Sequence, residues 1–171
     1  MPSLRHRLRP RVLVLLALVA AVALGALLPT AFGREQAEPA ATRDALAQTS
    51  RVQGAPGRTM VLSRVTVPAG VQLALHHHLG TQIAHVEAGV LTYTVRQGSA
   101  VVWEGESDQN PRKVRTIDAG ETARLRPEQW IVEQPSDVHE AANRGRVPVV
   151  LYLATLLRTG APPSTPVPPG G

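Results

Sequence analysis

The 171-residue sequence contains no cysteine, a single lysine among eighteen basic residues, and few aromatic residues. Without cysteine, disulfide bonds, thiolate nucleophiles, iron–sulfur clusters and cysteine-rich zinc sites are excluded. Four Trp and Tyr residues follow residue 33, with no stripe of basic side chains, so we expect no nucleic-acid partner. A glycine-rich phosphate loop is also missing. The composition leaves room for one domain and one metal site.

Most of the net positive charge lies at the N-terminus. Four arginines occur in the first eleven residues, and the rest of the chain holds fourteen basic and thirteen acidic side chains. An uncharged run over residues 12–28 follows, and a small-residue site ends at Gly33. This layout predicts a signal peptide over residues 1–33. The run is also at the lower limit of a membrane-spanning helix, so an uncleaved membrane anchor stays open. In both cases we expect the remainder to be secreted or otherwise extracytoplasmic.

Two polar segments flank a middle section. Residues 34–57 are small, polar and interrupted by proline and glycine, which predicts a flexible linker that could hold a short helix around 42–48. Residues 160–171 are rich in proline and glycine and predict a disordered tail whose deletion leaves stability unchanged. Residues 58–159 are long enough for one core of modest size.

The middle section is rich in Val, Thr and Leu and is interrupted by Gly, Pro and Asp at short intervals. This pattern predicts an all-β antiparallel barrel or sandwich, because no stretch keeps a helical apolar period beyond two turns. The strands that we expect are 60–67, 71–78, 82–88, 91–96, 101–104, 114–117, 122–125, 130–133, 138–142 and 147–157.

Five histidines follow the signal segment. Four of them lie within ten residues, namely His76, His77, His78 and His85, and the fifth is His139. Side chains alternate between the faces of a strand, so His76 and His78 share a face and His77 points the other way. Two imidazoles with this spacing on an inward face can bind one metal ion. A solvated run of histidines at a strand end is the alternative.

Two motifs surround these histidines. The first reads Gly70-x5-His76-x-His78-x3-Gln82-x6-Gly89, and the second runs from Pro135 through Asp137 to His139-x3-Asn143. Together they resemble the two motifs of the cupin superfamily, roughly G-x5-H-x-H-x3–4-E-x6-G and G-x5-P-x-G-x2-H-x3-N. The resemblance covers the whole middle section and implies an all-β double-stranded β-helix, the cupin or jelly-roll barrel. It also implies a divalent transition metal (Fe, Mn, Ni, Zn or Cu) bound by His76, His78, Gln82 and His139.

The sequence departs from these motifs at two positions. Gln82 stands where the family usually has a glutamate ligand, and an amide oxygen is a neutral, weaker ligand than a carboxylate. Asp137 replaces the usual glycine, with one residue fewer between Pro135 and His139, which we interpret as a local turn change. We expect His85 and Glu140 to face away from the interior, and Tyr93 to line the pocket.

Two functions of different classes are compatible with this pattern. The first is an exported metal-dependent enzyme, a dioxygenase or isomerase acting on a small molecule. The second is a non-catalytic extracytoplasmic protein that binds a metal or metabolite. The family resemblance also implies a homodimer formed through barrel edges. A membrane contact is expected only through the N-terminal segment, if it is not cleaved.

Overall fold

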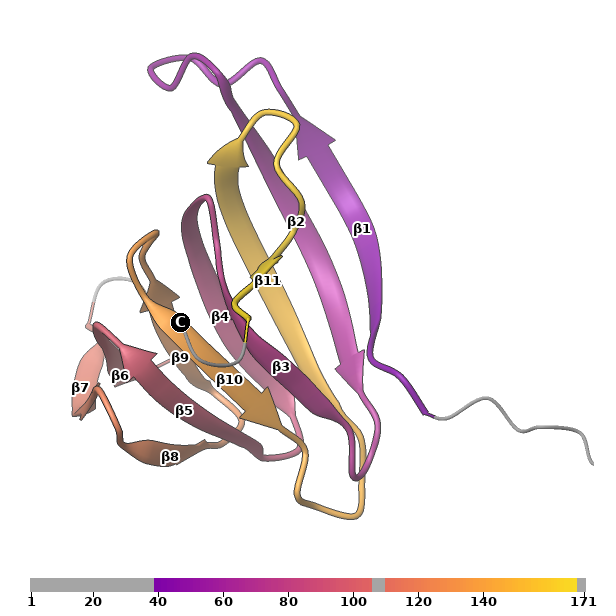
Figure 1. The fold of residues 1–171 in the computed structure, drawn as a ribbon, viewed down its shortest axis with the longest axis vertical. Coiled ribbons are helices and arrows are strands. Elements are labelled where there is room, and N and C mark those ends of the chain that lie inside the picture. Colours follow the sequence, from indigo (N-terminus) through magenta and orange to yellow (C-terminus); the bar gives the residue numbers. More distant parts are fainter. Residues whose placement is uncertain (1–38, 106–109, 169–171) are drawn as a thin grey trace, which may run out of the picture. The chain divides into compact units, whose positions relative to one another are not determined.

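The computed structural model describes residues 39–105 and 110–168, and every regular element among them is a strand (Figure 1). Those residues include no helix long and apolar enough to cross a membrane. The predicted signal or anchor over residues 1–33 lies outside the described part of the chain. The strands are β1 Thr42–Thr49, β2 Arg58–Val67, β3 Gln72–His77, β4 Gly80–Ala88, β5 Leu91–Gln97, β6 Ser99–Glu104, β7 Arg112–Asp118, β8 Thr122–Leu125, β9 Gln129–Glu133, β10 Val138–Ala142, β11 Val149–Arg158 and β12 Thr165–Pro166.

All ten strands predicted for the middle section are present, with ends that differ by at most two residues. The alternation of burial explains why they form. In β11, Val149, Leu151 and Leu153 are buried, whereas the residues between them reach the other face. Such alternation buries one face of a pleated strand and leaves the other in contact with water.

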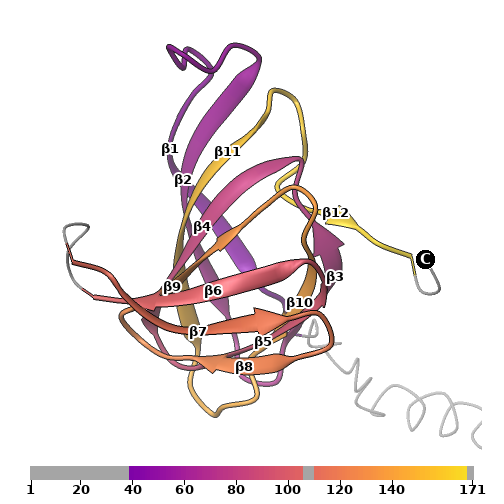
Figure 2. The same cartoon turned by 90° about the vertical axis from the view of Figure 1, so that its left-hand side faces the viewer.

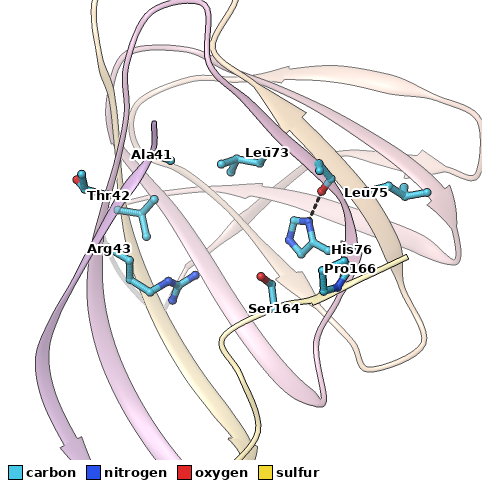
Figure 3. Close-up of a pocket in the computed structure, with 10 residues that line it drawn as sticks. Ala41, Thr42, Arg43, Leu73, Leu75, His76, Ser164 and Pro166 are labelled. Carbon is cyan, nitrogen blue, oxygen red and sulfur yellow. Dashed lines mark hydrogen bonds between the residues drawn. The ribbon is translucent and has the colours of Figure 1, made fainter. Parts of the chain in front are cut away.

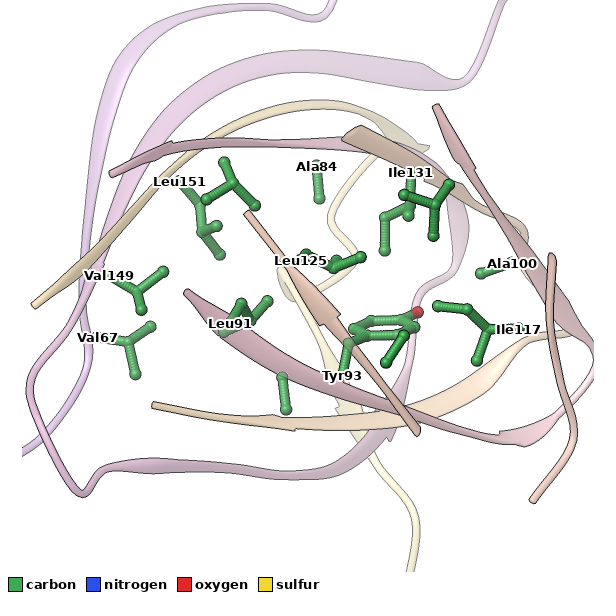
Figure 4. Packing of buried hydrophobic residues seen from close by; sticks show 14 of the residues in the cluster. Val67, Ala84, Leu91, Tyr93, Ala100, Ile117, Leu125, Ile131, Val149 and Leu151 are labelled. Atoms are coloured by element: carbon green, nitrogen blue, oxygen red, sulfur yellow. The ribbon is translucent and has the colours of Figure 1, made fainter. Parts of the chain in front are cut away.

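The strands form two antiparallel sheets, seen from two directions in Figures 1 and 2. The larger sheet has the order β1-β2-β11-β4-β9-β6-β7, and the smaller has the order β12-β3-β10-β5-β8. A core of aliphatic side chains with Tyr93 fills the interior (Figure 4). The fold is therefore all-β, with the two-sheet arrangement of the double-stranded β-helix, as the sequence predicts.

The segment predicted as a flexible linker differs from that prediction over residues 42–49. These residues form β1, which pairs in antiparallel register with β2, and the predicted short helix is absent there. All eight side chains of β1 are exposed. The strand is therefore held by backbone hydrogen bonds at the edge of β2 and not by burial, so apolar periodicity gave no sign of it.

The predicted disordered tail differs from the structure at residues 165–167. Thr165 and Pro166 pair with His77 and His76 of β3, and the Val167 amide donates to the Leu75 carbonyl. Proline cannot donate a backbone hydrogen bond, but its fixed φ suits an extended strand at a sheet edge. The composition that suggested disorder is thus compatible with a short edge strand.

Candidate metal centre

The fold brings three of the predicted histidines together. His76 lies in β3, and His78 is the first residue after this strand. His139 lies in the neighbouring strand β10, opposite His76 in register. One ring nitrogen from each of the three lies within 4.8 Å of the others. His78 and His139 are almost fully buried, whereas His76 is half-buried at the mouth of the interior. Three imidazoles converging in this way can bind a metal ion.

Hydrogen bonds of the ring Nδ1 atoms determine the tautomers of two histidines. His76 Nδ1 lies 2.6 Å from the Ala74 carbonyl oxygen, and His78 Nδ1 lies 2.7 Å from the Pro163 carbonyl oxygen. A carbonyl oxygen can only accept, so both Nδ1 atoms carry the proton and donate it. Each Nε2 is therefore unprotonated, which is the form that a metal ligand requires.

A carboxylate that the sequence analysis did not single out completes the cluster. Glu133 ends β9, is 3% exposed, and places its two carboxylate oxygens 3.4 Å from His78 Nε2 and 3.3 Å from His139 Nε2. In the described part of the chain, the ion-pair partners of Glu133 are histidines. One signal in the sequence could have identified it, because Glu133 has the same strand parity as Ile131, a core residue.

Gln82 lies directly opposite Glu133 across the β4–β9 pair. Its Nε2 donates to Glu133 Oε2 at 2.5 Å and lies 3.3 Å from His78 Nε2, while its Oε1 has no hydrogen-bond partner among the described residues. The carboxylate therefore turns the NH₂ group of Gln82 toward the cluster, and an NH₂ group has no lone pair to give a cation. In this arrangement Gln82 holds Glu133 in place. Its role as a metal ligand stays a prediction.

The pKa values give the cluster a negative charge at neutral pH. Burial raises the pKa of Glu133, but the charge of His139 and the hydrogen bonds and charges of its other neighbours lower it to about 2. Burial also lowers the pKa of His139 to about 4, against the opposing effect of Glu133. The pKa of His76 is likewise lowered, mainly by burial. An ionised carboxylate thus lies buried beside the neutral imidazoles of His76 and His139, which is unfavourable unless a cation joins them.

The remaining candidates lie as the strand parity predicts. Tyr93 is buried and stacks on His139 with ring centroids 5.2 Å apart, so it lines the interior. Its pKa is raised by burial and by the charge and hydrogen bonding of Glu133, so it stays a neutral phenol. His85 lies on the outer face beside Trp130, with Nε2 4.0 Å from Glu128. Glu140 also faces outward and pairs with Arg96.

The shortened second motif leaves His139 in the site. Asp137 Oδ2 accepts a hydrogen bond from the Gln134 amide at 2.7 Å, which closes the turn before β10. Asn143 at the end of the motif is buried, donates to the carbonyls of Val67 and Val147, and accepts from the Gly145 amide. It therefore joins the β10–β11 turn to β2. None of these hydrogen bonds involves a histidine of the cluster.

Two packed antiparallel sheets, with three histidines and one carboxylate between them, define a small double-stranded β-helix with a candidate metal centre. No protein-family model matches the chain, and no curated protein matches it.

Solved structures that resemble it include KdgF from a Halomonas species, with 19% identity over 71% of this chain and 84% of that chain and a TM-score of 0.46. A cupin 2 domain-containing protein from Halorhodospira halophila has 15% identity over 79% of this chain and 77% of that chain, with a TM-score of 0.49. A cupin-like protein from Thermotoga maritima has 16% identity over 74% and 75%, with a TM-score of 0.48. These similarities are too low to assign site residues by comparison. The candidate metal centre therefore rests on the contacts within this chain.

Proposed function

We propose that this protein binds one divalent transition metal through His76, His78 and His139, with Glu133 as the anionic ligand. The observation that carries the proposal is the buried Glu133 carboxylate, in contact with His78 and His139 and without an arginine or lysine partner in the described part of the chain. Three imidazole nitrogens and one carboxylate suit Fe(II), Mn(II), Ni(II), Zn(II) or Cu(II).

Metal analysis of the exported protein tests this proposal. We expect about one divalent ion per chain in the wild type, and loss of the ion in His76→Ala and His139→Ala, because each removes a strong ligand. His77→Ala is the matched control, because His77 adjoins His76 but has the opposite strand parity. Full metal content in both His76→Ala and His139→Ala would contradict the site.

The activity that we propose is that of a small-molecule dioxygenase or isomerase. A bound ion would supply Lewis acidity to a chelating ligand. The chain itself contributes Tyr93, a neutral phenol beside Glu133 that can donate a hydrogen bond, and an interior of aliphatic side chains that limits water. Oxygen uptake and substrate loss should be measured with the metal-loaded protein on diketones, vicinal diols and 2-oxo acids. Metal binding without any turnover would favour the alternative, an extracytoplasmic metal- or metabolite-binding protein.

We also propose export, from the charge and apolar layout of residues 1–33. Mass spectrometry of the secreted protein should find a chain that begins near Arg34. A membrane-bound protein that retains residues 1–28 would indicate an anchor instead.

In place of the barrel edges that the resemblance implies, we propose the outer face of the larger sheet as the homodimer surface. Leu62, Ile83 and Tyr152 are 43%, 42% and 36% exposed there and come from three adjacent strands. Adjacent exposed apolar side chains of this kind favour a protein contact. Sedimentation should show a dimer that Ile83→Lys converts to a monomer. Val147→Lys in the β10–β11 turn is the control. A wild-type monomer would contradict the proposal.

A further inference from the structure

A cavity of about 250 Å³ lies over His76, between β1 on one side and β3 with the C-terminal segment on the other (Figure 3). Arg43 of β1 and Ser164 and Pro166 of the C-terminal segment contribute to its walls. The two segments that the sequence predicted to be flexible therefore form the mouth of the site. The volume is below the 300–1,000 Å³ typical of sites for drug-sized ligands, so the occupant is small.

Arg43 is exposed, but the strand register places its side chain on the core-facing side of β1, at the open end of the cavity. Arg43 lies directly opposite Val65 of β2, and the Val65 side chain is buried in the core. Residues opposite each other in an antiparallel pair place their side chains on the same face of the sheet. Figure 3 shows the Arg43 side chain extending into the cavity, with His76 on the opposite wall.

No carboxylate forms an ion pair with Arg43 in the described residues, although the chain has nearly as many acidic as basic side chains beyond residue 11. Arg43 and His76 also line an inner cavity of about 50 Å³, together with Glu133 and His139. The same guanidinium thus faces both the outer cavity and the proposed metal centre. Leu73 and Val65 give both cavities an apolar wall.

We propose that the outer cavity binds a small carboxylate with a short apolar group, such as a 2-oxo acid, and that Arg43 contacts its carboxylate. A guanidinium accommodates a carboxylate through two parallel hydrogen bonds, which gives orientation as well as affinity. The oxygen next to the carboxylate would then face the metal centre, and the apolar group would contact Leu73 and Val65. This orientation rests on the proposed metal-binding function.

Calorimetric titration of the zinc-loaded protein with two matched probes tests the proposal. 2-Oxobutyrate and 2,3-pentanedione share an ethyl group and adjacent carbonyls, but only the former carries a charged carboxylate. The wild type should bind 2-oxobutyrate at least tenfold more tightly than 2,3-pentanedione. Arg43→Ala and Arg43→Gln should remove this preference.

Arg64→Ala is the matched control, because Arg64 lies opposite Asp44 on the outer face of the same strand pair and its loss changes the net charge equally. Circular dichroism and thermal unfolding of each variant show that it is folded. A wild type that binds both probes equally or neither, or an Arg43→Ala variant that keeps the preference, would overturn the proposal.

The metal content of every sample separates the two proposals. A wild type that takes up no metal would overturn the proposed function. In that case, 2-oxobutyrate binding by the metal-free protein that disappears in Arg43→Ala but persists in Arg64→Ala would still support the carboxylate site, and its absence would overturn that site as well.

Discussion

Replacing Glu133 with Gln should weaken divalent-metal binding by at least about 100-fold. The change keeps the shape of the side chain but removes the carboxylate that, among residues 39–105 and 110–168, contacts the histidines of the cluster. At a separation of about 4 Å and an effective dielectric constant of about 20, a unit charge and a divalent ion attract by about 8 kcal/mol. Desolvation of the carboxylate offsets much of this, and a third of it, about 2.7 kcal/mol, already corresponds to 100-fold.

Moving the carboxylate to the opposite strand should restore binding. Gln82 Nε2 lies 2.5 Å from Glu133 Oε2, so the double variant Gln82→Glu/Glu133→Gln preserves a carboxylate–amide pair with its direction reversed. We expect its metal affinity to come within about tenfold of the wild type. Gln82→Glu alone places two carboxylates in contact, at a cost of about 6 kcal/mol for charges about 3 Å apart. It should therefore destabilise the metal-free protein and strengthen metal binding.

The assay is competition of zinc between the protein and a chromogenic chelator, with the visible absorption of the cobalt-loaded protein as a second readout of the ligand set. Residues that only orient a metal ligand typically change affinity by 10- to 100-fold. A loss smaller than about 100-fold in Glu133→Gln, or no recovery in the double variant, would show that Glu133 orients the histidines without binding the ion.

Removing residues 161–171 should lower the melting temperature and weaken metal binding by about tenfold or more, because the Pro163 carbonyl accepts the hydrogen bond that fixes the His78 tautomer. An unchanged melting temperature and an unchanged metal affinity would refute this. Urea unfolding of the metal-free protein should show that the free energy of unfolding falls by about 3 kcal/mol from pH 6.5 to pH 4. Over this range His139 takes up a proton in the unfolded chain, where its pKa is about 6.5, before it does so in the folded protein, where its pKa is about 4. His139→Gln should remove most of this pH dependence. Asn143→Ala should cost about 2–4 kcal/mol in the same assay through three lost hydrogen bonds, without changing metal affinity per folded molecule.

The ten strands of the middle section and the shared inward face of His76 and His78 were predictable from the amino-acid sequence. Both follow from local rules, namely the period-two alternation of buried side chains and the Gly, Pro and Asp residues of the turns. The outward positions of His85 and Glu140 followed from the same parity. These properties depend on neighbours along the chain, and therefore they can be read from it.

Which strands are neighbours depends on the tertiary fold, and the pairing of the strands sets the composition of the site. Glu133 and Gln82 lie 51 residues apart and meet because β9 pairs with β4, a register that no local pattern encodes. Likewise, β1 and β12 carry no apolar period and are held by backbone hydrogen bonds at exposed sheet edges. Such bonds form with almost any side chain. Arg43, from the predicted flexible linker, and Pro163, from the predicted disordered tail, therefore both reach the candidate metal centre.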